Sequence, residues 1–426
     1  MKANHRDKKP LLERTKAMRR TKKFLAAGVA AGLLAGALVG TASGAGQRKS
    51  APLKGEGEGL KLIKNMPWAN GSDMEFATIK GRKILFAASY AAVEDGGGLH
   101  VIDTTKPNKP KELAHLKCAL YQGDVQISWT KKYVYLGADS AGGPESCLAV
   151  GKLGFMIIDV QNLKKPKPVG FAEIPRGSHN ITAHPRKPFV YNSDSDLNNA
   201  GLGVIEIWNV KNARKPKKVN EVMVGVHSPH DVSFNKQGTL AVTAAISHVD
   251  ILDTSNPAKP SLVFTNQCPG CSITHDAKFT PDGKKVLIGD EGGGGLAYPC
   301  PGGALYAYSV EGTETQPVLV PQGTYWPDEL VAAQGTNVGA CTSHVMDVSD
   351  DGKKLAISWY TAGTRFLDIS NTLGATIGEN GTGIQELGWF IPEGASSWSS
   401  KFHPSEKFIY SNDINRGLDV YKIVKK

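Results

Sequence analysis

Four histidines stand at the same position of an internal repeat, where metal chemistry could be built. Each opens a short alternating apolar run typical of a β-strand, and the four are His179, His230, His275 and His344. Neutral imidazole rings that meet at one point are suited to copper, zinc or iron. Three of them are followed by a side chain that could orient a ring through a hydrogen bond, namely Asn180, Asp231 and Asp276. The histidines therefore either hold a transition metal, act as general acids and bases, or only hydrogen-bond neighbouring strands.

The other repeats have different residues at this position and the next one. These are Ser72 and Asp73, Gly123 and Asp124, and Trp398 and Ser399. Because the position recurs in every repeat, we expect the histidines to share a central channel with Ser72, Asp73, Asp124 and Trp398. The histidines are confined to four consecutive repeats, which a purely structural role would not require. This one-sidedness favours a binding site.

The strands that position these residues are recognised from self-similarity along the chain. Four β-rich segments end in an acid or amide, and each is followed by a Lys-Pro pair whose proline lies seven residues further on. The four end residues are Asp103, Asp159, Asn209 and Asp253. Such a side chain can accept hydrogen bonds from the backbone N–H groups that follow, and proline fixes the chain before the next strand. The pattern predicts the same hairpin turn four times.

Three further units are degenerate, with strands near 305–309, 364–368 and 418–421 but no Lys-Pro turn. The units are 44 to 59 residues apart, which is the size of a four-stranded propeller blade. We therefore predict an all-β, seven-bladed β-propeller of four-stranded antiparallel blades over residues 60–426. Six or eight blades would require one degenerate unit to be misassigned. Residues 60–63 can supply the missing fourth strand of the last blade and close the ring.

The segments 99–103 (Leu-His-Val-Ile-Asp) and 155–159 (Phe-Met-Ile-Ile-Asp), with their Lys-Pro turns, resemble the LVIVD repeat of exported bacterial β-propeller proteins. The resemblance covers nearly all of residues 60–426 and implies the propeller fold and export. That family has no single agreed activity, so the resemblance supplies no catalytic residue. The histidine-lined channel is similar in architecture to selenium-binding-protein and methanethiol-oxidase propellers. Without a motif match, their activity does not transfer.

A propeller blade presents its a–b and c–d turns on one face, here called the plain face, and its other loops on the opposite, irregular face. All six cysteines fall in loops of the irregular face: Cys118, Cys147, Cys268, Cys271, Cys300 and Cys341. An even number in an exported protein favours disulfides. We prefer the pairs 118–147, 268–271 and 300–341, with 271–300 and 268–341 as the main alternative. The Cys-Pro-Gly-Cys spacing at 268–271 would also suit a metal half-site or a redox pair.

Two oxygen-rich segments of the irregular face could hold calcium. They are Asp194-Ser195-Asp196 with Asn198 and Asn199, and Asp290-Glu291 before four glycines. Neither has the spacing of an EF-hand, so solvated polar loops are the simpler interpretation. The sequence predicts calcium here only as a secondary cofactor.

The first 45 residues have the pattern of an export signal. A basic stretch ends at Lys23, an apolar run extends from Phe24 to about Gly40, and small residues precede a cut after Ala45. We expect residues 1–45 to be removed, by Sec rather than twin-arginine export, and residues 46–59 to form a flexible linker. The protein would then be secreted or associated with the cell surface, and would not be an integral membrane protein.

The formal charge of +10 does not indicate a nucleic-acid partner. Residues 1–50 contain 12 lysines and arginines and two acids, so residues 51–426 have 38 charges of each sign and no net charge. The excess basicity belongs to the leader. We therefore expect the mature chain to bind no nucleic acid.

These patterns predict a secreted propeller that acts as a binding or scaffold module through its irregular face. Its partner would be a protein, a cell-wall component or a small molecule. The alternative is a metal-binding protein or a metalloenzyme, of oxidoreductase or hydrolase type, that uses the channel histidines. The metal content of the purified protein separates the two hypotheses.

Overall fold

The computed structural model describes residues 50–139, 145–193, 204–224, 228–268, 270–295, 299–336, 339–372 and 383–425. The predicted signal peptide and the oxygen-rich segment 194–199 lie outside these stretches. No helix in the described stretches is long and apolar enough to cross a membrane.

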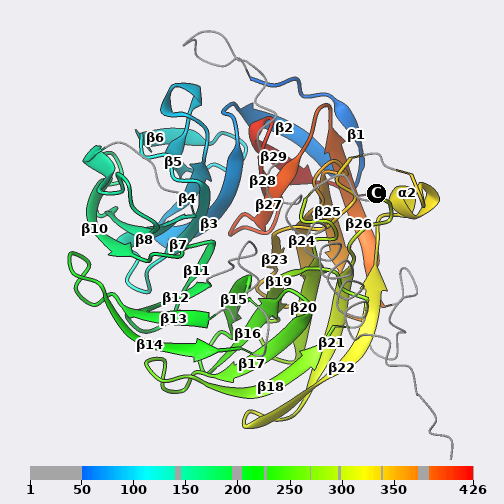
Figure 1. The fold of residues 1–426 in the computed structure, drawn as a ribbon. Coiled ribbons are helices and arrows are strands. Elements are labelled where there is room, and N and C mark those ends of the chain that lie inside the picture. The colour runs from blue at the N-terminus through cyan, green and yellow to red at the C-terminus, as the bar shows by residue number, and fades with distance from the viewer. Residues whose placement is uncertain are drawn as a thin grey trace, which may run out of the picture. The chain divides into compact units, whose positions relative to one another are not determined.

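Seven antiparallel sheets follow one another around a ring, which confirms the predicted seven-bladed β-propeller (Figure 1). Blade 1 contains β3 (Gly71–Ile79), β4 (Arg82–Ser89), β5 (Gly98–Asp103) and β6 (Lys111–Leu116). Blade 2 contains β7 (Gln122–Ile127), β8 (Tyr133–Ala138), β9 (Gly154–Asp159) and β10 (Lys167–Glu173). Blade 3 contains β11 (Asn180–Ala183), β12 (Phe189–Ser193), β13 (Val204–Asn209) and β14 (Lys217–Met223).

The remaining blades use the same order from the channel to the rim. Blade 4 contains β15 (Asp231–Phe234), β16 (Leu240–Ala245), β17 (His248–Asp253) and β18 (Ser261–Gln267). Blade 5 contains β19 (Thr274–Phe279), β20 (Lys285–Asp290), β21 (Leu305–Thr313) and β22 (Gln316–Tyr325). Blade 6 contains β23 (Met346–Val348), β24 (Lys354–Ser358), β25 (Thr364–Asp368) and β26 (Gln385–Pro392), and blade 7 contains β27 (Ser397–Phe402), β28 (Phe408–Asp413) and β29 (Gly417–Ile423). Loops contain the short helices η2 (Val93–Asp95), η3 (Glu145–Cys147) and α2 (Asp328–Ala332).

The N-terminal part of the described chain closes the ring. Strand β2 (Leu60–Met66) pairs with β29 and gives blade 7 its fourth strand, as predicted. The preceding segment differs from the prediction of a flexible linker over 46–59. Residues 55–58 form strand β1 (Gly55–Glu58), which pairs with β26 as a fifth strand of blade 6. Its backbone N–H and C=O groups find partners at the exposed edge of β26, and such an edge favours pairing whatever the side chains are.

Alternating side chains of a central strand such as β9 pack on two different neighbouring blades. In β9, Met156 and Ile158 join an apolar cluster with residues of blade 1, whereas Phe155 and Ile157 join a cluster with residues of blade 3. Both faces of the sheet are therefore buried at this strand, and its sequence is a continuous apolar run for that reason. Truncating one such side chain to alanine costs about 2–5 kcal/mol.

The predicted turns form as the sequence indicated. A side-chain oxygen of Asp103, Asp159, Asn209 and Asp253 accepts a hydrogen bond from the backbone N–H two residues later, at 2.9 to 3.0 Å. Asp368 of the degenerate sixth blade makes the same bond at 2.8 Å without a Lys-Pro pair. The acid or amide therefore suffices to form the turn. The proline, where present, further restricts the backbone before the next strand.

Three disulfides hold loops of the irregular face. They join Cys118 to Cys147, Cys268 to Cys271, and Cys300 to Cys341. These are the pairs preferred from the sequence, and the alternative pairing is not formed. The last two lie in loops that lead to histidine-bearing strands, because Cys271 and Cys341 precede His275 and His344 by four and three residues.

Candidate metal centre

Four adjacent blades place one histidine each at the wall of the channel. His179 and His230 directly precede the inner strands β11 and β15. His275 is the second residue of β19, and His344 lies two residues before β23. Successive ring centroids are 4.4, 4.2 and 4.0 Å apart, so the four rings form a continuous arc. The shared repeat position is therefore also one place in space.

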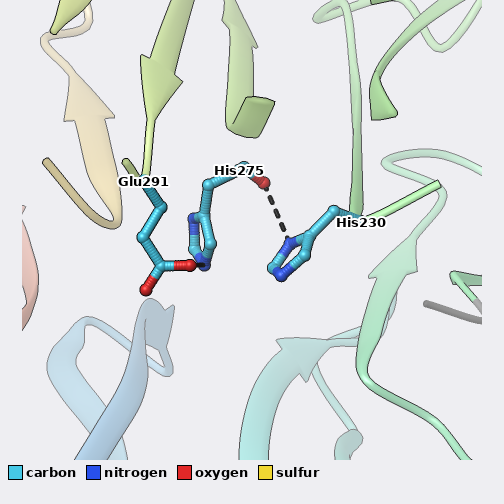
Figure 2. A group of neighbouring side chains, drawn as sticks. All are labelled: His230, His275 and Glu291. Carbon is cyan, nitrogen blue, oxygen red and sulfur yellow. Dashed lines mark hydrogen bonds and ion pairs between the residues drawn. The ribbon is translucent and has the colours of Figure 1, made fainter. Parts of the chain in front are cut away.

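Two of these histidines and a glutamate form a buried group that could hold a metal ion (Figure 2). One donor atom each from His230, His275 and Glu291 lies within 4.8 Å of the other two. The three residues are only 2%, 4% and 6% exposed. Glu291 directly follows β20, which pairs with the strand that carries His275. The sequence assigned Glu291 to a calcium loop, and its place beside the histidines was missed.

Glu291 also links the group to blade 6. Its Oε1 accepts a hydrogen bond from the Tyr360 hydroxyl at 2.6 Å and lies 3.5 Å from Nε2 of His344. Its Oε2 lies 3.8 Å from Nε2 of His275. The carboxylate is thus flanked by two imidazoles, and His344 is the fourth side chain around the group.

Backbone carbonyls orient two of the rings. Nδ1 of His230 lies 3.2 Å from the carbonyl oxygen of His275, and Nδ1 of His344 lies 2.7 Å from that of Trp398. Because a carbonyl only accepts, Nδ1 carries the proton in His344 and Nε2 keeps its lone pair. A ring held in this way is prepared to ligate a metal through Nε2. Nδ1 of His230 also lies 3.2 Å from the Asn180 side-chain nitrogen, which is a donor, so its two contacts are compatible with either tautomer. The Nδ1 atom of His275 is buried and has no hydrogen-bond partner among the described residues.

His179, at the end of the arc, has other partners. Its Nδ1 lies 2.8 Å from the Asp139 carboxylate, and its Nε2 lies 2.8 Å from the Gln122 side-chain nitrogen. Burial alone would lower the pKa of His179, but the Asp139 carboxylate outweighs it, and the pKa is raised. The structure therefore places this predicted ligand outside the group formed by His230, His275 and Glu291.

Burial sets the protonation of the other rings. It lowers the pKa of His230 and His275 well below the usual value, and neighbouring histidines lower it further. Burial also lowers the pKa of His344 to about 4. These three rings are therefore neutral near pH 7, the form that binds metals. Burial raises the pKa of Glu291 to about 7, although the hydrogen bond from Tyr360 opposes the shift. A bound cation would favour its ionised form.

The carboxylates predicted to orient the rings hold the blades together instead. Asp276 accepts a hydrogen bond from the backbone N–H of Met346 at 3.0 Å, and its Oδ1 lies 2.9 Å from Lys278 Nζ. Asp231 lies 3.4 Å from the same ammonium group. Both face a lysine one layer below the histidines, which compensates for their burial. Asn180 donates to the His230 carbonyl at 2.9 Å, and its side-chain nitrogen lies 3.2 Å from Nδ1 of the His230 ring, so it contacts both the backbone and the ring of that histidine.

The three predicted lining residues of blades 1 and 2 join inner strands to their neighbours in the same way. Asp73 accepts from the N–H of Val125 at 3.2 Å, and Asp124 from that of Ile181 at 2.6 Å. The Ser72 hydroxyl donates to the carbonyl of the next blade's Gly123 at 3.2 Å. Trp398 differs, because its ring packs on His344 with centroids 4.4 Å apart.

The second calcium segment, Asp290-Glu291, serves to position the site. The Asp290 carboxylate accepts hydrogen bonds from the N–H groups of Ser272 at 3.1 Å and Ile273 at 2.8 Å. Its main-chain carbonyl accepts from the hydroxyls of Thr342 at 2.8 Å and Ser343 at 3.0 Å. The loops that lead to His275 and His344 are thus fastened to the residue before Glu291. The two adjacent carboxylates have separate partners and do not form an oxygen cage.

The channel leaves room for a small species beside the group. A cavity of about 20 Å³ is lined by His275, His344, Trp398 and residues of the carboxylate layer. A space of this size holds roughly one water molecule or ion. His230 and Glu291 do not line this cavity, so it lies beside the group and is not enclosed by its three donors. The group itself offers two to three neutral imidazoles and one carboxylate, a donor set suited to zinc, copper or iron.

Comparison with known proteins places the chain by fold only. No family model matches the chain, and no curated protein matches it in sequence. Among solved structures it is similar to the β-propeller domain of Cps50 (Swd1) from Myceliophteria thermophila, with a TM-score of 0.58 and 9% sequence identity. The match covers 85% of this chain and 100% of that one. At this identity the likeness supports the propeller and transfers no ligand or activity.

Proposed function

We propose that this protein is an exported propeller of the LVIVD-repeat kind whose channel binds one transition-metal ion. His230, His275 and Glu291 would be ligands, with His344 in the fourth position. The observation that supports this most is the buried histidine–histidine–glutamate group with donor atoms within 4.8 Å of one another. The N-terminal signal pattern and three disulfides support export.

A bound metal ion would compensate for the burial of the Glu291 carboxylate. A carboxylate as buried as that of Glu291 is costly in its ionised form without a cation beside it. A bound ion would supply positive charge beside Glu291 and act as a Lewis acid or redox centre. The residues of this chain would hold it through neutral rings, of which those of His230 and His344 contact carbonyl groups, and Tyr360 would keep the carboxylate in place.

Metal analysis of exported, untagged protein tests the proposal. We expect about one zinc, copper or iron ion per chain, as in other proteins with a single such site. The double variant His230→Ala/His275→Ala and the single variant Glu291→Gln should lose the ion while the circular dichroism spectrum stays that of a β-protein. A matched control, His184→Gln/His403→Gln, alters two buried histidines of the plain face and should retain it.

The opposite result would favour a binding or scaffold module without a metal. If wild-type protein from a metal-supplemented host folds normally and contains no transition metal, the metal proposal is wrong. Equal metal loss in the control pair would show that the ion binds elsewhere or only reports folding.

A further inference from the structure

The plain face of blades 1 to 4 is strongly basic although residues 51–426 have no net charge. Eight turns form this region, here called the basic turns: 79–83, 103–111, 129–132, 159–168, 184–188, 209–218, 235–239 and 253–261. They contain 20 lysines and arginines and only three acids, a formal charge of +17. The rest of residues 51–426 therefore has a charge of −17. Total charge conceals this separation, because folding gathers cations that are far apart in sequence.

The basic turns lie on one side of the disc. Backbone hydrogen bonds join each c–d turn to the a–b turn of its own blade, as between Thr104 and Lys83 or between Thr254 and Thr239, both at 2.8 Å. Neighbouring blades are joined there too, since the His184 ring donates to Gly238 at 3.0 Å. Eighteen of the 20 cationic residues are exposed. Such a surface attracts polyanions over a distance of about a Debye length, near 8–10 Å at physiological salt.

A cleft between blades 2 and 3 concentrates the charge. Its volume is about 660 Å³, and four cations of one turn line it: Lys211, Arg214, Lys215 and Lys217. Asp159 is the acid among its lining residues, and Val169 and Val219 add apolar surface. A concave site with several cations and some apolar wall fits a chain of anionic groups on a carbon backbone better than it fits a flat bilayer.

The residue types of the basic turns also indicate which class of polyanion they would bind. Proteins that bind single-stranded nucleic acid stack bases on exposed aromatic rings, each contributing about 1–3 kcal/mol. Trp129 is the aromatic residue in the basic turns and Tyr133 is the one that lines the cleft, and both are half-buried against the apolar cluster of blades 2 and 3. The cations are lysines for the most part, which serve as point charges for phosphate. These features favour a polymer of sugar or polyol units over nucleic acid.

We propose that the basic turns bind a flexible, linear phosphodiester polymer of sugar or polyol units, seated in the cleft between blades 2 and 3. The phosphates would pair with Lys211, Arg214, Lys215 and Lys217, and the polymer would extend over the turns of the adjoining blades. This binding surface lies on the plain face, away from the loops that lead to the channel histidines, and it does not depend on a metal. It also differs from the expectation that the irregular face carries the binding function.

Binding of a fluorescent poly(glycerol phosphate) chain of about 20 units to the full disulfide-bonded protein tests this proposal. The cleft variant replaces Lys211, Arg214, Lys215 and Lys217 with glutamine. The control variant removes the same charge from four exposed lysines outside the basic turns, Lys61, Lys284, Lys353 and Lys407. At about 0.1 M salt we expect the cleft variant to bind at least tenfold more weakly and with a shallower salt dependence, because it makes fewer phosphate contacts. The control should bind within about twofold of wild type.

Three outcomes would overturn the proposal. One is that wild-type protein does not bind the polymer at low salt. Another is that both variants lose affinity equally, which would show that only net charge matters. The third is that single-stranded DNA or vesicles containing anionic phospholipid bind more tightly than the polymer, which would assign the face to a different partner. Unchanged thermal unfolding of both variants makes each of these outcomes interpretable.

Discussion

Two histidines of the plain face, His184 and His403, show how a neutral ring stabilises a turn. Nδ1 of His184 accepts a hydrogen bond from the N–H of Arg186 at 3.1 Å, and its Nε2–H donates to the Gly238 carbonyl of the next blade at 3.0 Å. His403 bonds in the same way, and its Nε2–H donates to Thr104 at 3.0 Å. Burial is the largest reason that the pKa of each ring is lowered. Only the neutral ring can accept and donate in this way.

The lowered pKa values predict a loss of stability in acid. The unfolded chain binds protons at these rings near pH 6.5, while the folded chain resists them, so the free energy of unfolding falls as the pH drops below about 6.5. The channel histidines with lowered pKa values act in the same direction. The variant His184→Gln/His403→Gln should be less stable at pH 7.5 by about 1 kcal/mol per lost hydrogen bond. It should also lose less stability than wild type between pH 7.5 and 5.5 in urea unfolding. An identical pH dependence in both proteins would contradict this account.

The residues of the candidate site were only partly predictable. The histidines could be found because the same position recurs in each blade, so alignment of the repeats alone brings them together. Glu291 and Tyr360 could not, because they follow second strands of blades 5 and 6, where loop length varies and no period fixes their direction. The carbonyls that orient the rings carry no sequence signal at all. Only the fold shows that they lie within hydrogen-bond distance.

At the scale of elements, a buried polar network fastens the closing strand β2 to blade 7. Asn65 of β2 donates to the Asp419 carboxylate at 2.8 Å and to the Arg416 carbonyl at 3.0 Å. The Arg416 guanidinium bonds Asp419 at 2.7 Å and reaches the carbonyl of Pro52 at 3.0 Å. The first and last parts of the described chain are thus joined by side chains as well as by the sheet. Breaking this network should weaken the pairing of β2 with β29, which closes the ring.

We expect Arg416→Met to destabilise the protein by about 3–5 kcal/mol, because it leaves the Asp419 carboxylate buried without its cation. The matched control is Arg82→Met, which breaks an ion pair of similar length with Asp103 in an exposed turn. That change should cost no more than about 1 kcal/mol. Urea unfolding measures both. Losses of equal size would mean that the network contributes no more to closure than a surface ion pair does.

The sequence predicted strands more reliably than it predicted their partners. The repeated acid or amide located the hairpins, since a local hydrogen bond to the following backbone forms each turn. Strand β1 was missed because Gly55–Glu58 has no apolar alternation, and all four residues are exposed. Its pairing with β26 depends on an edge that exists only after the ring has formed. Non-local pairing of this kind leaves little trace in composition.

At the scale of the whole molecule, the two faces of the disc have different chemistry. Loops of the irregular face, held by disulfides, lead to the channel with its neutral imidazoles and the Glu291 carboxylate. The plain face of blades 1 to 4 presents the basic turns. The sequence predicted the propeller and its channel, but a net charge of zero hid this polarity until the turns were placed in space.

The most direct test of the metal centre is anomalous scattering from crystals of metal-loaded protein, measured at the absorption edge of the bound ion. We predict a single strong peak in the channel, about 2.0–2.2 Å from ring nitrogens of His230 and His275 and from a carboxylate oxygen of Glu291. A peak confined to another part of the molecule, or a channel without one in protein shown to contain metal, would contradict the account.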